Sequence, residues 1–247
     1  MTEPMIDSRI SGILFDKDGT LFDFQKTWGQ VVETVLDTLA PDRETWTRMA
    51  RAGGYDPVRG TFVAGSPVVA ESNGAIARLW RQFRPDLSET EIERVLDDTA
   101  LDALSDPGAL FPAAPNLPGL LGCLREAGYF LGVATHDSEL SAKTQLKAAG
   151  AIEAFDFIAG FDSGHGLKPG PGMLFAFARV TGIAPGRIAM VGDSRHDLET
   201  GLSAGAAATI GVLTGPATRA DLTPFASHVI PSIADLPSLL ASTTPRG

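Results

Sequence analysis

Short apolar runs alternate with helix-length segments from residue 111 onward, and this alternation restricts the possible folds more than any other feature. Each strand-like run ends in turn residues and is followed by a segment with apolar positions at helical spacing. The strand candidates are 129–135, 155–161, 187–193, 207–213 and 228–230, and the helix candidates are 117–128, 138–150, 171–182 and 195–205. Such alternation predicts strand–helix–strand units, and hence a parallel sheet covered by helices on both faces.

Another strand candidate, residues 10–16, is separated from this series by a long stretch that is mainly helical in pattern. Residues 28–40 have apolar side chains at helical spacing, and residues 88–104 open with a serine and an early glutamate, which are typical of a helix start. Between them, residues 51–67 are rich in Gly and Pro and are interpreted as a loop. The prediction is an α/β fold with a Rossmann-like parallel sheet core, formed by 1–23 and 112–247, and an inserted α-helical cap, formed by 24–111.

Composition narrows the functional classes. The chain of 247 residues carries a formal net charge of -10, which argues against a nucleic-acid binder and against attachment to anionic membranes. An anionic substrate would therefore need a locally positive site. Cys123 is the only cysteine; it is expected to be buried on an apolar helix face, and a single cysteine fits a reducing compartment. With neither a signal-like start nor an apolar stretch of membrane-span length, the expected location is cytoplasmic.

The end of the first strand candidate and the turn after it form the segment ILFDKDGTLF, residues 13–22, which places Asp16 and Asp18 one residue apart just before a glycine. If the strand ends at Asp16 and the chain turns at Asp18, the two carboxylates can converge on one point. Two like charges at close range are costly unless a cation lies between them or one carboxyl stays protonated. The segment therefore indicates a metal ion, an acid catalyst, or both.

Three further polar residues lie at or just beyond the ends of other strand candidates. Thr135 ends 129–135, Asp193 ends 187–193, and Lys168 follows 155–161 in the segment GHGLKPG. Alone, each has an ordinary explanation in turns, caps or solvated loops. Because ligands of open parallel sheets bind outside the carboxyl ends of the strands, these residues can share one site with Asp16 and Asp18. A nucleophile, a hydroxyl, a cation and carboxylates for Mg²⁺ together suit phosphoryl transfer.

Four sequence segments carry a family resemblance: FDKDGTLFD, the threonine of VATHD, the lysine of GLKPGPGMLF, and VGDSRHD. Together they resemble the four ordered motifs of the haloacid dehalogenase superfamily. The spacing of the motifs and the sequence between them resemble those of its phosphoglycolate phosphatase-like branch, in which a helical cap follows the first motif. The resemblance implies a Mg²⁺-dependent phosphatase that hydrolyses a small phosphorylated metabolite, with 2-phosphoglycolate favoured, through an aspartyl-phosphate intermediate.

The resemblance also implies a role for each motif residue. Asp16 would be the nucleophile, and Asp18 would be the general acid and base. Thr135 would donate a hydrogen bond to the phosphoryl oxygens, while Lys168 would neutralise charge and orient Asp16. The implied Mg²⁺ ligands are Asp16, Asp193 and the backbone carbonyl of Asp18, with Asp197 acting through water. The chemistry is coherent, because a carboxylate nucleophile splits one difficult hydrolysis into two easier steps.

Two further residues are predicted to touch the substrate. His136 follows Thr135, at a position where relatives often carry a small amide or glycine, and Arg59 lies in the Gly-rich segment of the cap. Three histidines lie next to motifs, but a zinc site is disfavoured because neither an H-x-x-x-H pair nor a cysteine accompanies His136, His165 and His196.

Several related functions fit less well or stay open. A phosphonate hydrolase would need a cap lysine, and no lysine lies between Lys26 and Lys143; a dehalogenase would lack Asp18. A signalling receiver orders its acidic residues differently. A sugar-phosphate phosphatase or mutase of the same fold, and a catalytically inert phospho-ligand-binding protein, remain alternatives. The expected partner is a small phosphate ester, and the sequence predicts no oligomeric state.

Overall fold

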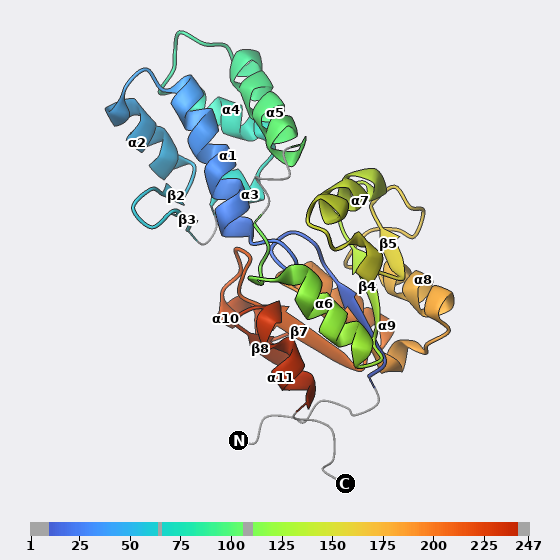
Figure 1. The fold of residues 1–247 in the computed structure, drawn as a ribbon. Helices are drawn as coiled ribbons and strands as arrows, with labels where there is room; N and C mark the ends of the chain where they lie inside the picture. The colour runs from blue at the N-terminus through green and yellow to red at the C-terminus, as the bar shows by residue number, and fades with distance from the viewer. Residues whose placement is uncertain (1–9, 64–65, 106–110, 242–247) are drawn as a thin grey trace. The chain divides into compact units, whose positions relative to one another are not determined.

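The chain forms two compact units, described here from a computed structural model (Figure 1). The first unit comprises 1–23 and 112–247, and the second comprises 24–111. The structure describes residues 10–63, 66–105 and 111–241, so the outermost parts of the predicted core segments, 1–9 and 242–247, lie outside it. Within the described residues, every helix is too short or too polar to cross a membrane.

The first unit is built on a six-stranded sheet with the order β5-β4-β1-β6-β7-β8, in which every neighbouring pair is parallel. This confirms the predicted α/β class. The central strands are buried along their whole length, as expected for strands covered on both faces. The strands are β1 (Gly12–Phe15), β4 (Phe130–Ala134), β5 (Phe157–Ala159), β6 (Ile188–Gly192), β7 (Ala208–Val212) and β8 (His228–Ile230).

Helices connect and cover these strands. Figure 1 shows α6 and α11 in front of the sheet, while α8 and α9 contribute to a continuous buried cluster that includes Leu14, Phe177 and Met190. The helices of this unit are α6 (Leu117–Glu126), α7 (Glu139–Ala148), α8 (Gly172–Thr181), α9 (Arg195–Ala204), α10 (Arg219–Leu222) and α11 (Leu236–Ala241). Short 3₁₀ turns lie at η2 (Ile152–Ala154), η3 (Pro185–Arg187) and η4 (Ile233–Asp235).

The second unit is helical and has a hydrophobic core of its own, in which Met49, Trp80 and Ile92 are fully buried. The Trp80 indole N–H donates to the Met49 carbonyl oxygen at 3.0 Å. The predicted start of the last helix is confirmed, because Ser88 and Glu91 exchange hydrogen bonds at its N-terminus. The elements are α1 (Phe24–Leu39), α2 (Arg43–Ala52), β2 (Tyr55–Asp56), β3 (Thr61–Phe62), α3 (Pro67–Ala70), α4 (Asn73–Arg81) and α5 (Glu89–Ser105).

Two expectations were wrong. The segment 51–67 is not only a loop, since it contains a small antiparallel hairpin that pairs Tyr55 with Phe62; strands of two residues are too short to leave a periodic pattern. Cys123 is exposed rather than buried. The buried stripe of α6 is formed by Leu117, Leu121 and Leu124, and position 123 lies outside that stripe.

Candidate active site

The candidate site begins where the strand order reverses. The chain runs outward from β1 to β4 and β5, then returns to the other side of β1 to form β6. Asp16 follows β1 and Asp193 follows β6, so the two aspartates leave neighbouring strands at this switch point. The Asp16 backbone N–H donates to the Val191 carbonyl at 2.8 Å, which fixes the end of β1 against β6. Crevices at such points are the usual ligand sites of open parallel sheets.

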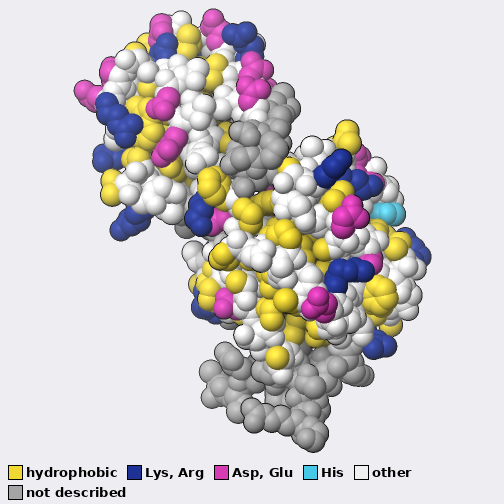
Figure 2. All heavy atoms as spheres, viewed as in Figure 1, with side chains coloured by type: hydrophobic (Ala, Val, Ile, Leu, Met, Phe, Trp, Pro, Cys, Tyr) yellow, Lys and Arg dark blue, Asp and Glu magenta, His cyan; other side chains and the backbone are white. Residues whose placement is uncertain are grey.

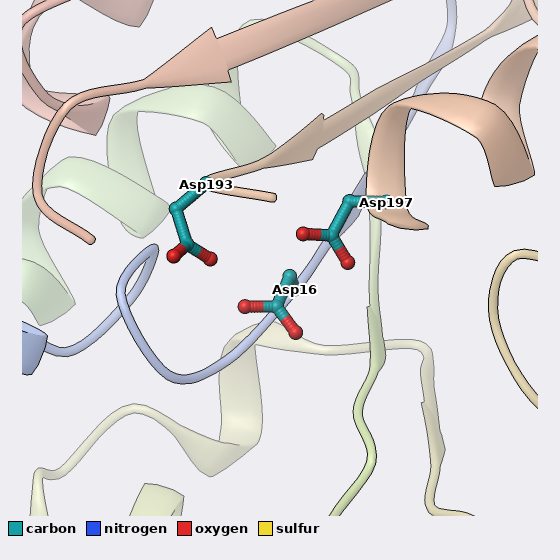
Figure 3. A group of neighbouring side chains, drawn as sticks. All are labelled: Asp16, Asp193 and Asp197. Carbon is teal, nitrogen blue, oxygen red and sulfur yellow. The ribbon is translucent and has the colours of Figure 1, made fainter. Parts of the chain in front are cut away.

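Three carboxylates converge there. Asp16, Asp193 and Asp197 are all buried, and each offers an oxygen within 4.8 Å of the others. Figure 3 shows the three side chains pointing toward one another from three segments. Asp197 enters from the first turn of α9, where its Oδ2 accepts from the Ser194 backbone N–H at 3.0 Å and from the Ser194 hydroxyl at 2.6 Å. Helix capping thus orients Asp197 toward the group.

Lys168 supplies the positive charge next to the three converging carboxylates. It lies in the loop between β5 and α8, and its ammonium donates to Asp16 Oδ1 at 2.5 Å and to Asp197 Oδ1 at 2.6 Å. The side chain is 3% exposed. Burial alone would lower the pKa of Lys168, but Asp16 and Asp197 outweigh it and hold the pKa well above its usual range. Lys168 is therefore a permanent cation that pins the Asp16 carboxylate.

Even with Lys168 present, the group has an excess of negative charge. Burial raises the pKa of Asp16 to about 7, with Asp197 and Asp18 adding to the rise and Lys168 opposing it. Burial, followed by Asp16 and Asp197, also raises the pKa of Asp193 well above its ordinary value. Three carboxylates against one ammonium leave two negative charges, which a divalent cation with a preference for oxygen ligands would balance.

The Asp193 carboxylate lies in a cradle of backbone. A Cβ added at Gly215 would lie 1.8 Å from Asp193 Oδ2, and one added at Gly19 would lie 2.5 Å from the same oxygen. Gly19 also has a φ of +86°, which favours glycine. Thr214 Oγ1 donates to the Gly19 carbonyl at 2.6 Å and joins the two glycine-bearing loops. The cradle and the buried oxygens around it fit a small hard cation such as Mg²⁺.

Asp18 is placed differently from the other predicted acids. Its carboxylate is not one of the three that converge; Asp18 Oδ1 accepts from the Lys17 ammonium at 2.6 Å instead. The Asp18 side chain is 29% exposed, so it remains accessible to a small molecule. Thr135, by contrast, is buried, and its hydroxyl oxygen accepts from the Asp137 backbone N–H at 3.0 Å. That bond leaves the hydroxyl proton of Thr135 to donate.

The two residues predicted to touch the substrate, and the histidines that lie next to motifs, have different surroundings. His136 is exposed, and its Nε2 is 3.2 Å from the Lys168 carbonyl oxygen; its ring centroid is 6.3 Å from that of His196. His165 packs against Phe157 instead. Arg59 belongs to the second unit, where its side chain is 80% exposed and its guanidinium pairs with Asp56 at 3.0 Å.

The surface of the second unit carries charges of both signs. On the face in view, Figure 2 shows basic and acidic side chains of residues 24–111 interspersed rather than gathered by sign. Arginines of this unit pair with nearby acidic residues. Arg84 pairs with Asp86 at 2.7 Å and Arg81 with Glu89 at 3.6 Å, in addition to the pair of Arg59 with Asp56. Surface pairs in which at least one partner is exposed contribute little to stability.

Five residues next to the site were not singled out from the sequence: Lys17, Asp137, Gln145, Thr214 and Gly215. Lys17 stands in plain view between two aspartates, but a lysine in a turn is ordinarily solvated. A lysine flanked by acidic residues at the end of a buried strand is the one local signal that could have found it. Gln145, Thr214 and Gly215 come from segments outside the quoted motifs, and Asp137, although it ends the segment VATHD, gives no local sign that it faces Lys17.

Comparison with known proteins decides the family. Residues 10–205 match the family described as haloacid dehalogenase-like hydrolase. The chain belongs to this family. A curated relative from Dickeya dadantii (strain 3937), named "Probable phosphatase IndB", is 35% identical over 222 residues, which cover 88% of this chain and 87% of the relative.

Two other relatives of this haloacid dehalogenase-like hydrolase are named by substrate. An N-acetylmuramic acid 6-phosphate phosphatase from Pseudomonas aeruginosa is 31% identical, and the match covers 80% of this chain and 79% of the relative. A phosphoglycolate phosphatase from Escherichia coli O157:H7 is 27% identical and covers 79% of each chain. The resemblance to the phosphoglycolate phosphatase-like branch is confirmed, and so is the prediction of a phosphatase.

A solved structure supports the fold independently. The crystal structure of a HAD family hydrolase from Deinococcus radiodurans R1, with bound phosphate and sodium, superposes with a TM-score of 0.72 at 24% identity. The match covers 96% of this chain and 97% of that one. At this level of identity the likeness establishes a shared fold.

Proposed function

We propose that this chain hydrolyses a small phosphate monoester in a Mg²⁺-dependent reaction that passes through a phosphoryl group on Asp16. The observation that carries the proposal is the buried arrangement of Asp16 between Lys168 and Asp193 at the switch point of the sheet. In this scheme the first unit is the catalytic core and the second is a cap that selects the substrate.

In the first step a carboxylate oxygen of Asp16 attacks phosphorus, and the bond from phosphorus to the ester oxygen breaks. Lys168 holds Asp16 Oδ1 and stabilises negative charge on the transferring oxygens. Thr135 donates its free hydroxyl proton to one of those oxygens. Asp18 gives a proton to the departing alkoxide, which leaves as the alcohol.

In the second step water attacks the phosphorus of the acyl phosphate. Asp18, now a carboxylate, accepts a proton from that water, and the bond from phosphorus to the Asp16 oxygen breaks. Inorganic phosphate leaves, and Asp16 returns to its starting state. Splitting the hydrolysis in this way allows one aspartate to act as nucleophile and the other to move protons in both directions.

The residues that would hold Mg²⁺ are Asp16 and Asp193, with the Asp18 backbone carbonyl. Bound there, the ion would offset the charge repulsion between an anionic nucleophile and an anionic phosphate. Asp197 has a more indirect role, because Lys168 and Ser194 already engage both of its oxygens. We assign Asp197 to positioning Lys168 and to contact with the ion through water.

For the substrate we favour 2-phosphoglycolate, supported by relatives named phosphoglycolate phosphatase. A sugar phosphate is the second candidate, supported by the relative named N-acetylmuramic acid 6-phosphate phosphatase, which is 31% identical. His136 at the edge of the site and Arg59 in the cap are the proposed substrate contacts. We also propose a cytoplasmic location, supported by the single free cysteine, Cys123.

A phosphate-release screen tests the proposal. Purified protein would be offered 2-phosphoglycolate, hexose phosphates, N-acetylmuramic acid 6-phosphate and an aryl phosphate, each with Mg²⁺ and with excess chelator. We expect phosphate release only with Mg²⁺ and a clear preference for one metabolite. Full activity in chelator would contradict the metal assignment. Conversion of a sugar 1-phosphate into its 6-phosphate without phosphate release would identify a mutase instead.

A further inference from the structure

One buried cation at the site takes no part in the proposed chemistry. Lys17 lies between Asp16 and Asp18, and its side chain is 0% exposed. An ammonium removed from water is costly unless all three of its N–H groups find acceptors. The position and partners of Lys17 therefore need a physical explanation.

The acceptors number three and come from three segments. The Lys17 ammonium donates to Asp18 Oδ1 at 2.6 Å and to Gln145 Oε1 of α7 at 2.5 Å, and it pairs with Asp137 Oδ2, after β4, at 3.1 Å. The ring of Phe22 lies 5.7 Å from the ammonium. Burial alone would lower the pKa of Lys17, but Asp18 and Asp137 outweigh it and raise the pKa. Lys17 is thus a charged clamp across the turn after β1, the loop after β4, and α7.

The clamp continues to the proposed phosphoryl-binding hydroxyl. The Asp137 backbone N–H donates to Thr135 Oγ1 at 3.0 Å, while the Asp137 carboxylate faces Lys17. Ser141 Oγ donates to Asp137 Oδ2 at 3.4 Å, and the Gln145 amide donates to Ser141 Oγ at 3.2 Å. A closed hydrogen-bonded ring therefore joins the two loops. Networks that are satisfied in this way rigidify their members.

We propose that Lys17 is a positioning residue: it holds Oδ1 of the Asp18 carboxyl group in register with the Thr135 loop, so that the proton given to the leaving group is carried on Oδ2. Lys17 does not touch the substrate in this account; it acts through Asp18. Holding Asp18 Oδ1 fixes the orientation of a carboxylate that is otherwise accessible. The inference rests on the proposed function, because it assumes that Asp18 protonates the leaving oxygen.

The test compares two phosphate esters that differ in leaving group. Lys17→Met removes the charge and keeps an unbranched side chain. An alkyl phosphate needs a proton on its leaving oxygen and an activated aryl phosphate hardly does, so kcat/KM, which covers the steps up to phosphoryl transfer, separates them. We expect kcat/KM for the alkyl ester to fall about 10²-fold and that for the aryl ester by less than about tenfold. The Mg²⁺ concentration for half-maximal rate should stay unchanged.

Two variants accompany it. Gln145→Leu removes one acceptor and keeps every charge, so it reports on the clamp even if Lys17→Met does not fold; the same selective loss should appear, smaller in size. Lys143→Met, on the exposed face of the same helix α7, is the matched control and should leave both rates unchanged. If kcat/KM fell equally for the two esters, or if neither variant lost activity, the role of Lys17 would be overturned and the proposed function would still stand. A wild-type protein inactive on both esters would overturn the proposed function, and this inference with it.

Discussion

Adding one methyl group beside Asp193 should disrupt the metal site without replacing any of the proposed ligands. In Gly215→Ala the new Cβ would lie 1.8 Å from Asp193 Oδ2 and 2.4 Å from Asp193 Cγ. Side-chain Cβ atoms essentially never approach other heavy atoms closer than 3.0 Å, so the carboxylate oxygen and the loop must separate by at least 1.2 Å, the difference between 3.0 and 1.8 Å. Misplacement of about 1 Å at a reacting centre can cost roughly 10²-fold in rate.

We therefore expect Gly215→Ala to lower kcat/KM about 10²-fold and the apparent Mg²⁺ affinity about 10–100-fold, with an overpacking cost of about 1–3 kcal/mol in stability. Mg²⁺ titrations followed by phosphate release would measure kcat/KM and the apparent Mg²⁺ affinity, and thermal shift would measure the stability. Gly122→Ala in α6 is the control, since its added Cβ would meet nothing within 4 Å beyond its chain neighbours and the backbone of its own helix. Wild-type Mg²⁺ dependence in Gly215→Ala would refute the role of the glycine cradle.

Three further expectations concern pH, metal identity and the cap. Because burial raises the pKa of Asp16 to about 7 and also raises the pKa of Asp193, protons should compete with Mg²⁺: calorimetry should show the apparent affinity rising by at least about tenfold per pH unit below about pH 7. By the same linkage, protonation of Asp16 stabilises the metal-free protein, and this contribution should fall as pH rises from 3.8 to about 7. A Mg²⁺ affinity that does not change with pH would argue against a raised pKa of Asp16 and so against both expectations. Ca²⁺ should inhibit, because its larger and looser coordination shell disturbs in-line attack; equal rates with Ca²⁺ and Mg²⁺ would count against the scheme. Arg59→Ala should raise KM for the best substrate and spare a small aryl phosphate, while the exposed Arg78→Ala should change neither; equal loss on both substrates would assign Arg59 to the fold or the chemistry.

The sheet and its polar edge were predictable because both leave local signals. Parallel strands covered on both faces appear as apolar runs, and β1 and β6 are followed directly by Asp16 and Asp193. Once the strands were recognised, the rule that parallel strands share a carboxyl edge placed these aspartates and Lys168 near one another. The same reasoning could not foresee that Asp18 turns toward Lys17 rather than toward the three converging carboxylates.

The supporting contacts were not predictable, because they join segments far apart in the chain. Thr214 and Gly19 are 195 positions apart, and Lys17 and Gln145 are 128 positions apart. Local pattern carries no information on such pairs, and a lysine in a turn has every local reason to be solvated. The glycine at position 215 likewise resembles any loop glycine until the Asp193 carboxylate is found against it.

The location of the phosphoryl group is the most direct test of the central claim. Asp18→Asn should slow both proton transfers, each worth roughly 10²–10⁴-fold, while an activated aryl phosphate still transfers its phosphoryl group. With Mg²⁺ present, this variant should release a burst of aryl alcohol and then nearly stop. Peptide mass spectrometry of the quenched protein should find phosphate on the peptide that contains Asp16, and none when Asp16→Asn is added. Phosphate on another residue, or undiminished turnover by Asp16→Asn, would contradict the assignment of Asp16 as the nucleophile.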